Sequence, residues 1–150
     1  MEEKKEEYGG IEQALREGWV LKVYSMAGSG FGVLNSPNKE SIRVRCYQNP
    51  FYVSDILRQL SGKFLGIELT ESETKKDSPL DEWVRDGNDI FGRREGDGIR
   101  LGIKHNKKSL ISIAPQPTFA QAYSILNQIE YTSDLTNNFE FMEQVKKFLR

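Results

Sequence analysis

Two stretches of this 150-residue chain repeat one another, and this repeat restricts the fold more than any other feature of the sequence. Ile11–Gly18 matches Leu80–Gly87 in its acidic residues, its arginine and its final glycine. Gly28–Phe51 and Gly96–Phe119 align without gaps at an offset of 68 and share 7 of 24 residues. Because the matches keep one order along the chain, they predict two copies of one unit. The alternative is a chance similarity between two hairpins.

Hydrophobic periodicity predicts a helix, three strands and a second helix in the first copy. The first four elements are expected at Ile11–Glu17, Trp19–Ser25, Phe31–Asn35 and Ser41–Tyr47. Asn49 and Pro50 have the residue types of a helix N-cap and a first helical position, and Gly62 is expected to end that helix. Phe64–Leu69 alternates like an additional strand.

The second copy follows the same plan. Ser78, Pro79 and Asp81 predict a capping box at the start of its first helix, which Gly87 ends. The later elements are expected at Asn88–Arg94, Ile99–His105, Leu110–Ala114 and Phe119–Ile129. An amphipathic helix at Phe139–Leu149 is predicted in addition, and its apolar stripe could form a homodimer contact.

We therefore expect an α+β fold with two tandem helix–three-strand–helix repeats, antiparallel sheets and an extra C-terminal helix, packed as one body with a pseudo-two-fold axis. A unit of about 50 residues is marginal alone, so the two copies should share a core. The expected organisation is an acidic N-terminal tail at 1–10, a first repeat at 11–70, an acidic linker at 71–79 and a second repeat at 80–150.

Composition excludes several classes of site. One cysteine and one histidine exclude a disulfide within the chain and metal sites built from cysteine or histidine clusters. No apolar run approaches the ~18 residues of a membrane span, and the start MEEKKEEYGG lacks the apolar centre of a signal peptide. A lone Cys46 fits a reducing compartment. We expect a cytoplasmic protein with no cofactor and no membrane partner.

The formal net charge of −1 hides an uneven distribution. Gly18–Tyr47 and Gly87–Pro115 each carry a net charge of +3, whereas the N-terminus and Glu68–Asp86 are acidic. Strand faces that combine cations with tyrosines can contact phosphates and stack bases. The predicted nucleic-acid-binding residues are Lys22, Tyr24, Lys39, Arg43, Arg45, Tyr47, Arg93, Arg94, Arg100, Lys104, Lys107 and Lys108. The alternative is an ordinary solvated face of an antiparallel sheet.

No motif predicts catalysis. The glycine-rich segment Gly28–Gly32 continues into a strand, so it fits a hairpin turn rather than a phosphate-binding loop. Glu73 and Lys75 resemble the carboxylate–x–Lys element of some metal-dependent nucleases, in three residues only. The element order is similar to that of double-stranded-RNA-binding domains, but the basic helix start of those domains is absent at Asn49–Phe51 and Pro117–Phe119.

Three functions follow from these patterns, and the first two have equal weight. The first is a nucleic-acid-binding module, with single-stranded DNA or RNA as ligand. The second is a non-catalytic protein-interaction or regulatory module that acts through the acidic segment or the C-terminal helix. The third, a small metal-dependent hydrolase, would need carboxylates gathered in a cleft. We expect no catalytic residue and no bound metal.

Overall fold

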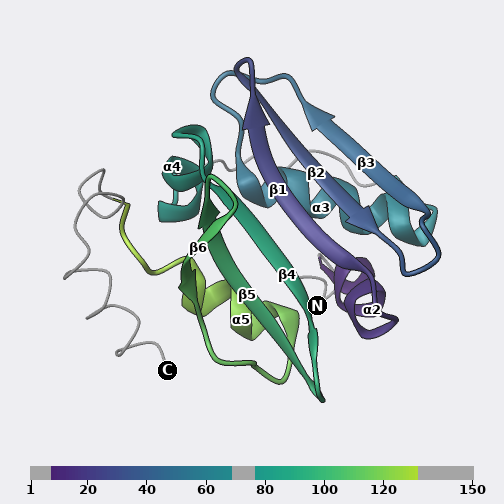
Figure 1. Cartoon of the computed structure of the whole chain (residues 1–150). Helices are drawn as coiled ribbons and strands as arrows, with labels where there is room; N and C mark the ends of the chain where they lie inside the picture. Colours follow the sequence, from purple (N-terminus) through teal and green to yellow (C-terminus); the bar gives the residue numbers. More distant parts are fainter. Residues whose placement is uncertain (1–7, 69–76, 132–150) are drawn as a thin grey trace, which may run out of the picture.

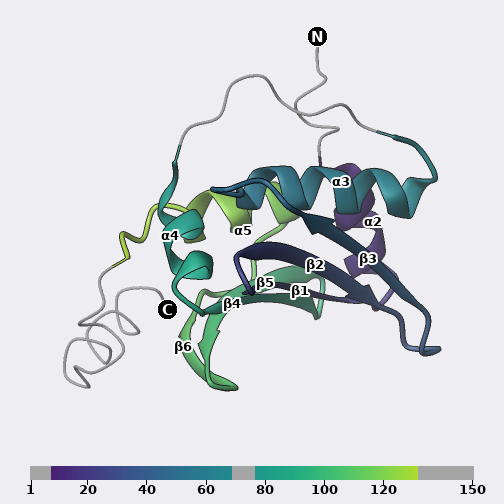
Figure 2. The same ribbon diagram turned by 90° about the horizontal axis from the view of Figure 1, so that it is seen from above.

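In a computed structural model, which describes residues 8–68 and 77–131, the chain forms one six-stranded antiparallel sheet with helices on one of its faces (Figures 1 and 2). The elements in chain order are α2 (Gly9–Arg16), β1 (Val20–Met26), β2 (Ser29–Asn35), β3 (Ser41–Cys46), α3 (Val53–Leu65), α4 (Pro79–Arg85), β4 (Asp89–Glu95), β5 (Gly98–His105), β6 (Lys108–Ser112) and α5 (Phe119–Leu126). The α+β class and the antiparallel pairing are confirmed.

The sheet joins two three-stranded meanders through their first strands. Its strand order is β3-β2-β1-β4-β5-β6, and β1 pairs with β4 through Leu21–Gly92, Lys22–Phe91 and Val23–Ile90. The two hairpins correspond at an offset of 69, since Val20 pairs with Asn35 and Asp89 pairs with Lys104. The gapless offset of 68 is therefore wrong for the β1–β2 and β4–β5 hairpins, because their strand pairing does not align Gly28 with Gly96.

The core lies between the sheet and the four described helices, which Figure 2 shows on the same side of the sheet. Alternate residues of β1, such as Leu21 and Val23, are buried there, and Ile99, Leu101 and Ile103 of β5 continue the same layer. Strand alternation predicts this division because successive side chains point to opposite faces. Apolar sheet faces thus pack against helices and not against each other.

Glycine allows α3 to lie close to β2. A Cβ atom added at Gly30 would lie 2.6 Å from Ile56 Cδ1 and from Phe51 Cδ1. One added at Gly32 would lie 2.6 Å from Ile56 Cγ2. A larger residue at either position would push α3 away from the sheet, so the glycine-rich segment has a packing role in addition to its turn.

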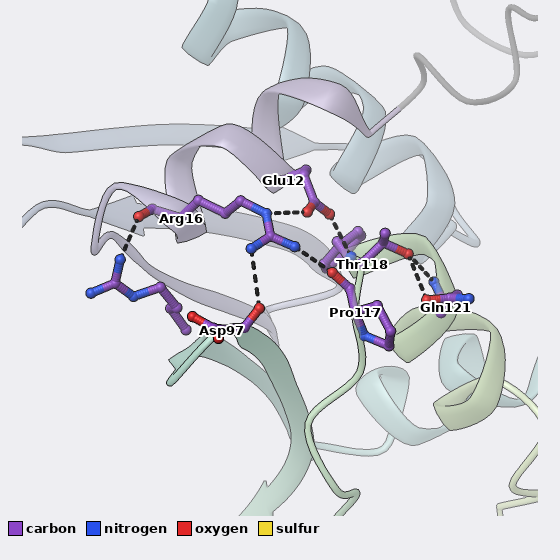
Figure 3. Close-up of polar contacts among 8 residues, drawn as sticks. Glu12, Arg16, Asp97, Pro117, Thr118 and Gln121 are labelled. Carbon is purple, nitrogen blue, oxygen red and sulfur yellow. Dashed lines mark hydrogen bonds and ion pairs between the residues drawn. The ribbon is translucent and has the colours of Figure 1, made fainter.

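Side chains of α2 hold the segment before α5 (Figure 3). Glu12 accepts a hydrogen bond from the Phe119 backbone N–H at 2.5 Å and pairs with Arg16 at 2.6 Å. Arg16 also donates to the backbone carbonyls of Pro117 and Asp97. These contacts link the first described helix to the last described helix.

Side chains of α4 hold the segment before α3 in a similar way. Asp81 accepts a hydrogen bond from the Val53 backbone N–H at 2.7 Å, and Arg85 donates to the Phe51 carbonyl. Asp81 also accepts from the backbone N–H of Ser78 at 2.8 Å, which confirms the predicted capping box. One buried carboxylate therefore caps two helices.

Three local predictions in the first copy are wrong. The second helix starts at Val53, not near Pro50, because its N-terminal cap is the distant Asp81. It continues through Gly62 and ends at Gly66, whose φ of 77° suits a left-handed C-cap. Residues 64–65 are therefore helical and the predicted strand is absent from the described residues 64–68; its last residue, and the C-terminal helix at 139–149, lie outside the described parts of the chain.

Candidate nucleic-acid interface

The face of the sheet turned away from the helices has no described helix on it (Figure 2), and we call it the open face. Backbone alternation and strand pairing assign side chains to it, because paired residues point to the same side. Its larger side chains are Val20, Lys22, Tyr24, Met26, Phe31, Val33, Asn35, Arg43, Arg45, Asp89, Phe91, Arg93, Glu95, Arg100 and Lys104. Tyr47 follows at the end of β3.

Positive charge dominates the open face. Its six cationic side chains are Lys22, Arg43, Arg45, Arg93, Arg100 and Lys104. Among residues 8–68 and 77–131, two open-face carboxylates, those of Asp89 and Glu95, oppose them, so these residues give the face a net charge of +4 on a chain of net charge −1. Such a concentration on one surface attracts polyanions.

Aromatic rings and cations form a continuous ladder over β1, β2 and β3. The rings of Tyr24 and Phe31 are stacked, with centroids 5.1 Å apart and an interplanar angle of 11°. The Arg45 guanidinium lies 5.1 Å from the Phe31 centroid and 4.4 Å from that of Tyr47. Lys22 Nζ lies 4.8 Å from the Tyr24 centroid. We call Lys22, Tyr24, Phe31, Arg45 and Tyr47 the ring ladder.

Sequence reasoning missed Phe31 and Phe91 as open-face residues. Phe31 lies opposite Tyr24 and Arg45, and Phe91 lies opposite Lys22 with Lys104 Nζ 4.7 Å from its ring centroid. The alternation of β2, with glycine on the helix side, is the signal that could have identified Phe31. The pairing of β1 with β4 was needed to identify Phe91.

One carboxylate engages both open-face arginines of the second half. Arg100 forms two hydrogen bonds of 2.7 Å with the Glu95 carboxylate and donates to Ser112 Oγ and the Ile113 carbonyl. These hydrogen bonds lower the pKa of Glu95 and raise that of Arg100. Arg93 reaches the same carboxylate at 3.3 Å. Arg100 therefore has little donor capacity left for a ligand.

A second carboxylate lies between the halves. Asp89 Oδ2 is 3.8 Å from Lys22 Nζ. Burial raises the pKa of Asp89, and the charges of Lys22, Lys104 and His105 oppose that rise. His105 itself lies at the end of β5, with Nδ1 3.0 Å from Asn88 Oδ1.

The remaining predicted site residues lie away from this face or at its ends. Arg94 points to the helix side and donates to the Arg16 carbonyl at 3.1 Å. Lys39 lies in the β2–β3 loop, whereas Lys107 and Lys108 lie at the β5–β6 turn. Because β1 and β4 are antiparallel, these two connections are at opposite ends of the sheet. The structure therefore does not bring the twelve predicted residues into one patch.

Two hollows mark the open face. One, of about 860 Å³, is lined by Tyr24, Phe31, Arg43, Arg45 and Tyr47 and extends around the edge of β3 to Lys63. The other, of about 470 Å³, is lined by Phe91, Arg93, Arg100 and Lys104 among others. Both are shallow surfaces beside cations and rings, and neither gathers several carboxylates.

The described residues form neither a metal-binding cluster nor a membrane-spanning helix. Within residues 8–68 and 77–131, no three histidine, cysteine, aspartate or glutamate side chains gather closely enough to hold a metal ion. None of the helices in those ranges is long and apolar enough to cross a membrane. Comparison of the chain with protein-family models, curated proteins and solved structures finds no match.

Proposed function

We propose that this protein is a non-catalytic nucleic-acid-binding module, with single-stranded DNA or RNA as the favoured ligand, and that the open face of its sheet is the binding surface. The observation that carries this proposal is the net charge of +4 on a face that also presents the ring ladder. Lysine and arginine contact backbone phosphates, while exposed rings stack on bases.

Two alternatives explain less of the geometry. A merely solvated face accounts for polar residues but not for an excess of four positive charges on a chain whose net charge is −1. A protein partner is favoured by one observation, the exposed apolar residues Leu65 and Ile67 at the C-terminal end of α3. The predicted C-terminal helix, which would serve that alternative, lies outside the described residues, and so does part of the acidic segment.

We also infer that the chain is a duplicated unit with a pseudo-two-fold axis between β1 and β4. The matched residues Glu12 and Asp81 each accept a hydrogen bond from the first backbone N–H of the other copy's second helix. The matched Arg16 and Arg85 each donate to the carbonyl two residues before that helix. At an offset of 69, Leu21 corresponds to Ile90 and Val23 corresponds to Gly92. The pair Leu21–Gly92 therefore corresponds to the pair Val23–Ile90, as a two-fold axis between β1 and β4 requires.

The location that fits this proposal is the cytoplasm. Nucleic acid is available there, and a reducing compartment suits Cys46, which is buried and not in a disulfide.

Fluorescence anisotropy with labelled single-stranded DNA, single-stranded RNA and duplex DNA tests the proposed function. We expect binding at about 50 mM salt that weakens steeply towards about 200 mM, as counterion release requires. Replacement of Arg43 and Arg45 by alanine should weaken it further. Absence of binding to every probe at low salt would refute the proposal and favour a protein partner.

A further inference from the structure

We infer that the first half of the open face, formed by β1 to β3, is the binding half, and that it recognises an unpaired base by stacking it on Tyr47 while Arg43 and Arg45 contact the adjacent phosphates. This inference rests on the proposed function and narrows it. The ligand class is single-stranded nucleic acid, because a duplex keeps its bases stacked inside the helix.

The two halves differ in how many of their cations are available. Arg93 and Arg100 share the Glu95 carboxylate, and Lys22 faces Asp89. Arg43 and Arg45 form no ion pair with any residue in the described ranges, and their guanidinium hydrogen bonds there are with the Ser41 and Ser29 hydroxyls. A phosphate bound by these two arginines does not have to displace a carboxylate, so the first half binds it more favourably.

The ladder holds Arg45 in place before a ligand arrives. Its guanidinium lies against the rings of Phe31 and Tyr47, and Nη2 donates to Ser29 Oγ at 3.2 Å. Five N–H donors are available on a guanidinium, so most remain for a phosphate. Because the side chain is already oriented, little conformational entropy is lost on binding.

Tyr47 is the ring of the ladder that remains available for a base. Tyr24 contacts Lys22 and Phe31, and Phe31 contacts Tyr24 and Arg45. Tyr47 terminates the series: within the described residues its ring contact is with Arg45, and 72% of the residue is exposed. A base stacked on its remaining face extends the ladder by one ring, with its phosphate near the arginines.

The test uses the full chain and short labelled oligonucleotides. Anisotropy is measured at about 50 mM salt with oligothymidylate, oligouridylate, an oligonucleotide of abasic sites and a duplex. The proteins are the wild type, Tyr47→Ala, Tyr47→Phe and, as a matched ring removal in the other half, Phe91→Leu. Thermal unfolding of each variant establishes that it is folded, and exposure of Tyr47 makes its substitution mild for stability.

We expect Tyr47→Ala to weaken oligothymidylate or oligouridylate binding by about 5-fold to about 100-fold, the range of one lost base stack. Its affinity for the abasic strand should stay unchanged, Tyr47→Phe should bind nearly as wild type, and Phe91→Leu should lose less affinity than Tyr47→Ala. The two pyrimidine probes decide between DNA and RNA as the preferred strand. Duplex should bind more weakly than either probe.

Three results would overturn the inference while leaving the proposed function intact. They are wild-type-like binding by Tyr47→Ala, an equal or larger loss in Phe91→Leu, and a duplex affinity equal to that for single strands. Failure of the wild type to bind any of the probes would instead refute the proposed function together with this inference.

Discussion

Replacement of Asp81 by alanine should destabilise the fold more than any other single substitution of a carboxylate in α2 or α4. Asp81 is 2% exposed and accepts hydrogen bonds from the Val53 N–H at 2.7 Å and the Ser78 N–H at 2.8 Å. Both donors belong to helix N-termini, where backbone N–H groups lack partners within the helix. The substitution therefore removes the caps of α3 and α4 together.

The magnitude follows from the number and type of these hydrogen bonds. A hydrogen bond to a charged group contributes about 1.5–3 kcal/mol, and a buried donor left without a partner adds a desolvation cost. Loss of both hydrogen bonds therefore costs about 3–5 kcal/mol in free energy of unfolding. In a domain of about 150 residues, each kcal/mol lowers the Tm by about 2–4 °C, so the expected decrease is about 6–20 °C.

Glu12→Ala is the matched control, since Glu12 caps α5 from α2. Its side chain is 27% exposed and its other contact is an i,i+4 ion pair with Arg16. Its loss should cost about 1–2 kcal/mol, the usual value of an N-cap. Urea unfolding followed by circular dichroism measures both variants. A loss below about 1 kcal/mol for Asp81→Ala, or a larger loss for Glu12→Ala than for Asp81→Ala, would show that Asp81 does not stabilise both helix N-termini.

Two further predictions concern local packing and pH. Gly10→Ala should destabilise the fold by about 1–3 kcal/mol or more, because its Cβ would lie 2.1 Å from the Ser61 carbonyl oxygen. Gly9→Ala is the control, since a Cβ there meets nothing within 4 Å. Chemical unfolding compares the two variants, and equal stabilities would contradict this packing. Because its hydrogen bonds to Arg100 lower the pKa of Glu95, this carboxylate stabilises the fold above its unfolded pKa of about 4.3, and the contribution is lost as the pH falls through the folded pKa. As the pH falls below about 4.3, Glu95→Gln should therefore lose less stability than wild type. Equal losses of stability in the two proteins, measured by urea unfolding, would contradict a stabilising Glu95–Arg100 ion pair.

Much of the strand layer could be predicted from the sequence. The alternation of Ile42, Val44 and Cys46 with Arg43 and Arg45 separates helix side from open side in β3, as the structure has it. Period-two alternation is a local property that needs no knowledge of neighbouring strands. For this reason, the sequence could assign Arg43 and Arg45 to the open side of β3.

Features that depend on distant partners could not be predicted. The start of α3 at Val53 depends on Asp81, which is 28 residues away in sequence. Arg100 is paired with Glu95 across the β4–β5 hairpin. The sequence shows both charged residues but not their contact. Arg94 was assigned to the interface, yet one step along β4 puts it on the helix side, where it bonds to Arg16.

The joining of the two meanders into one sheet also lay beyond local reasoning. Nothing in β1 or β4 alone identifies the other as its neighbour, because the unpaired backbone groups of an edge strand can pair with any other edge strand. Once β1 and β4 pair, all six strands contribute to one open face, and its net charge becomes a property of the complete sheet.

The salt dependence of single-strand binding shows whether Arg43 and Arg45 contact phosphates on the open face. Wild type, an Arg43→Ala/Arg45→Ala double variant and a Lys107→Ala/Lys108→Ala double variant of equal charge change are titrated with oligothymidylate over a series of salt concentrations. If the two arginines contact phosphates, their removal makes the negative slope of log affinity against log salt less steep by about 1.4, while the loop-lysine variant keeps nearly the wild-type slope. Equal slopes for all three proteins, or no wild-type binding at low salt, would contradict the account.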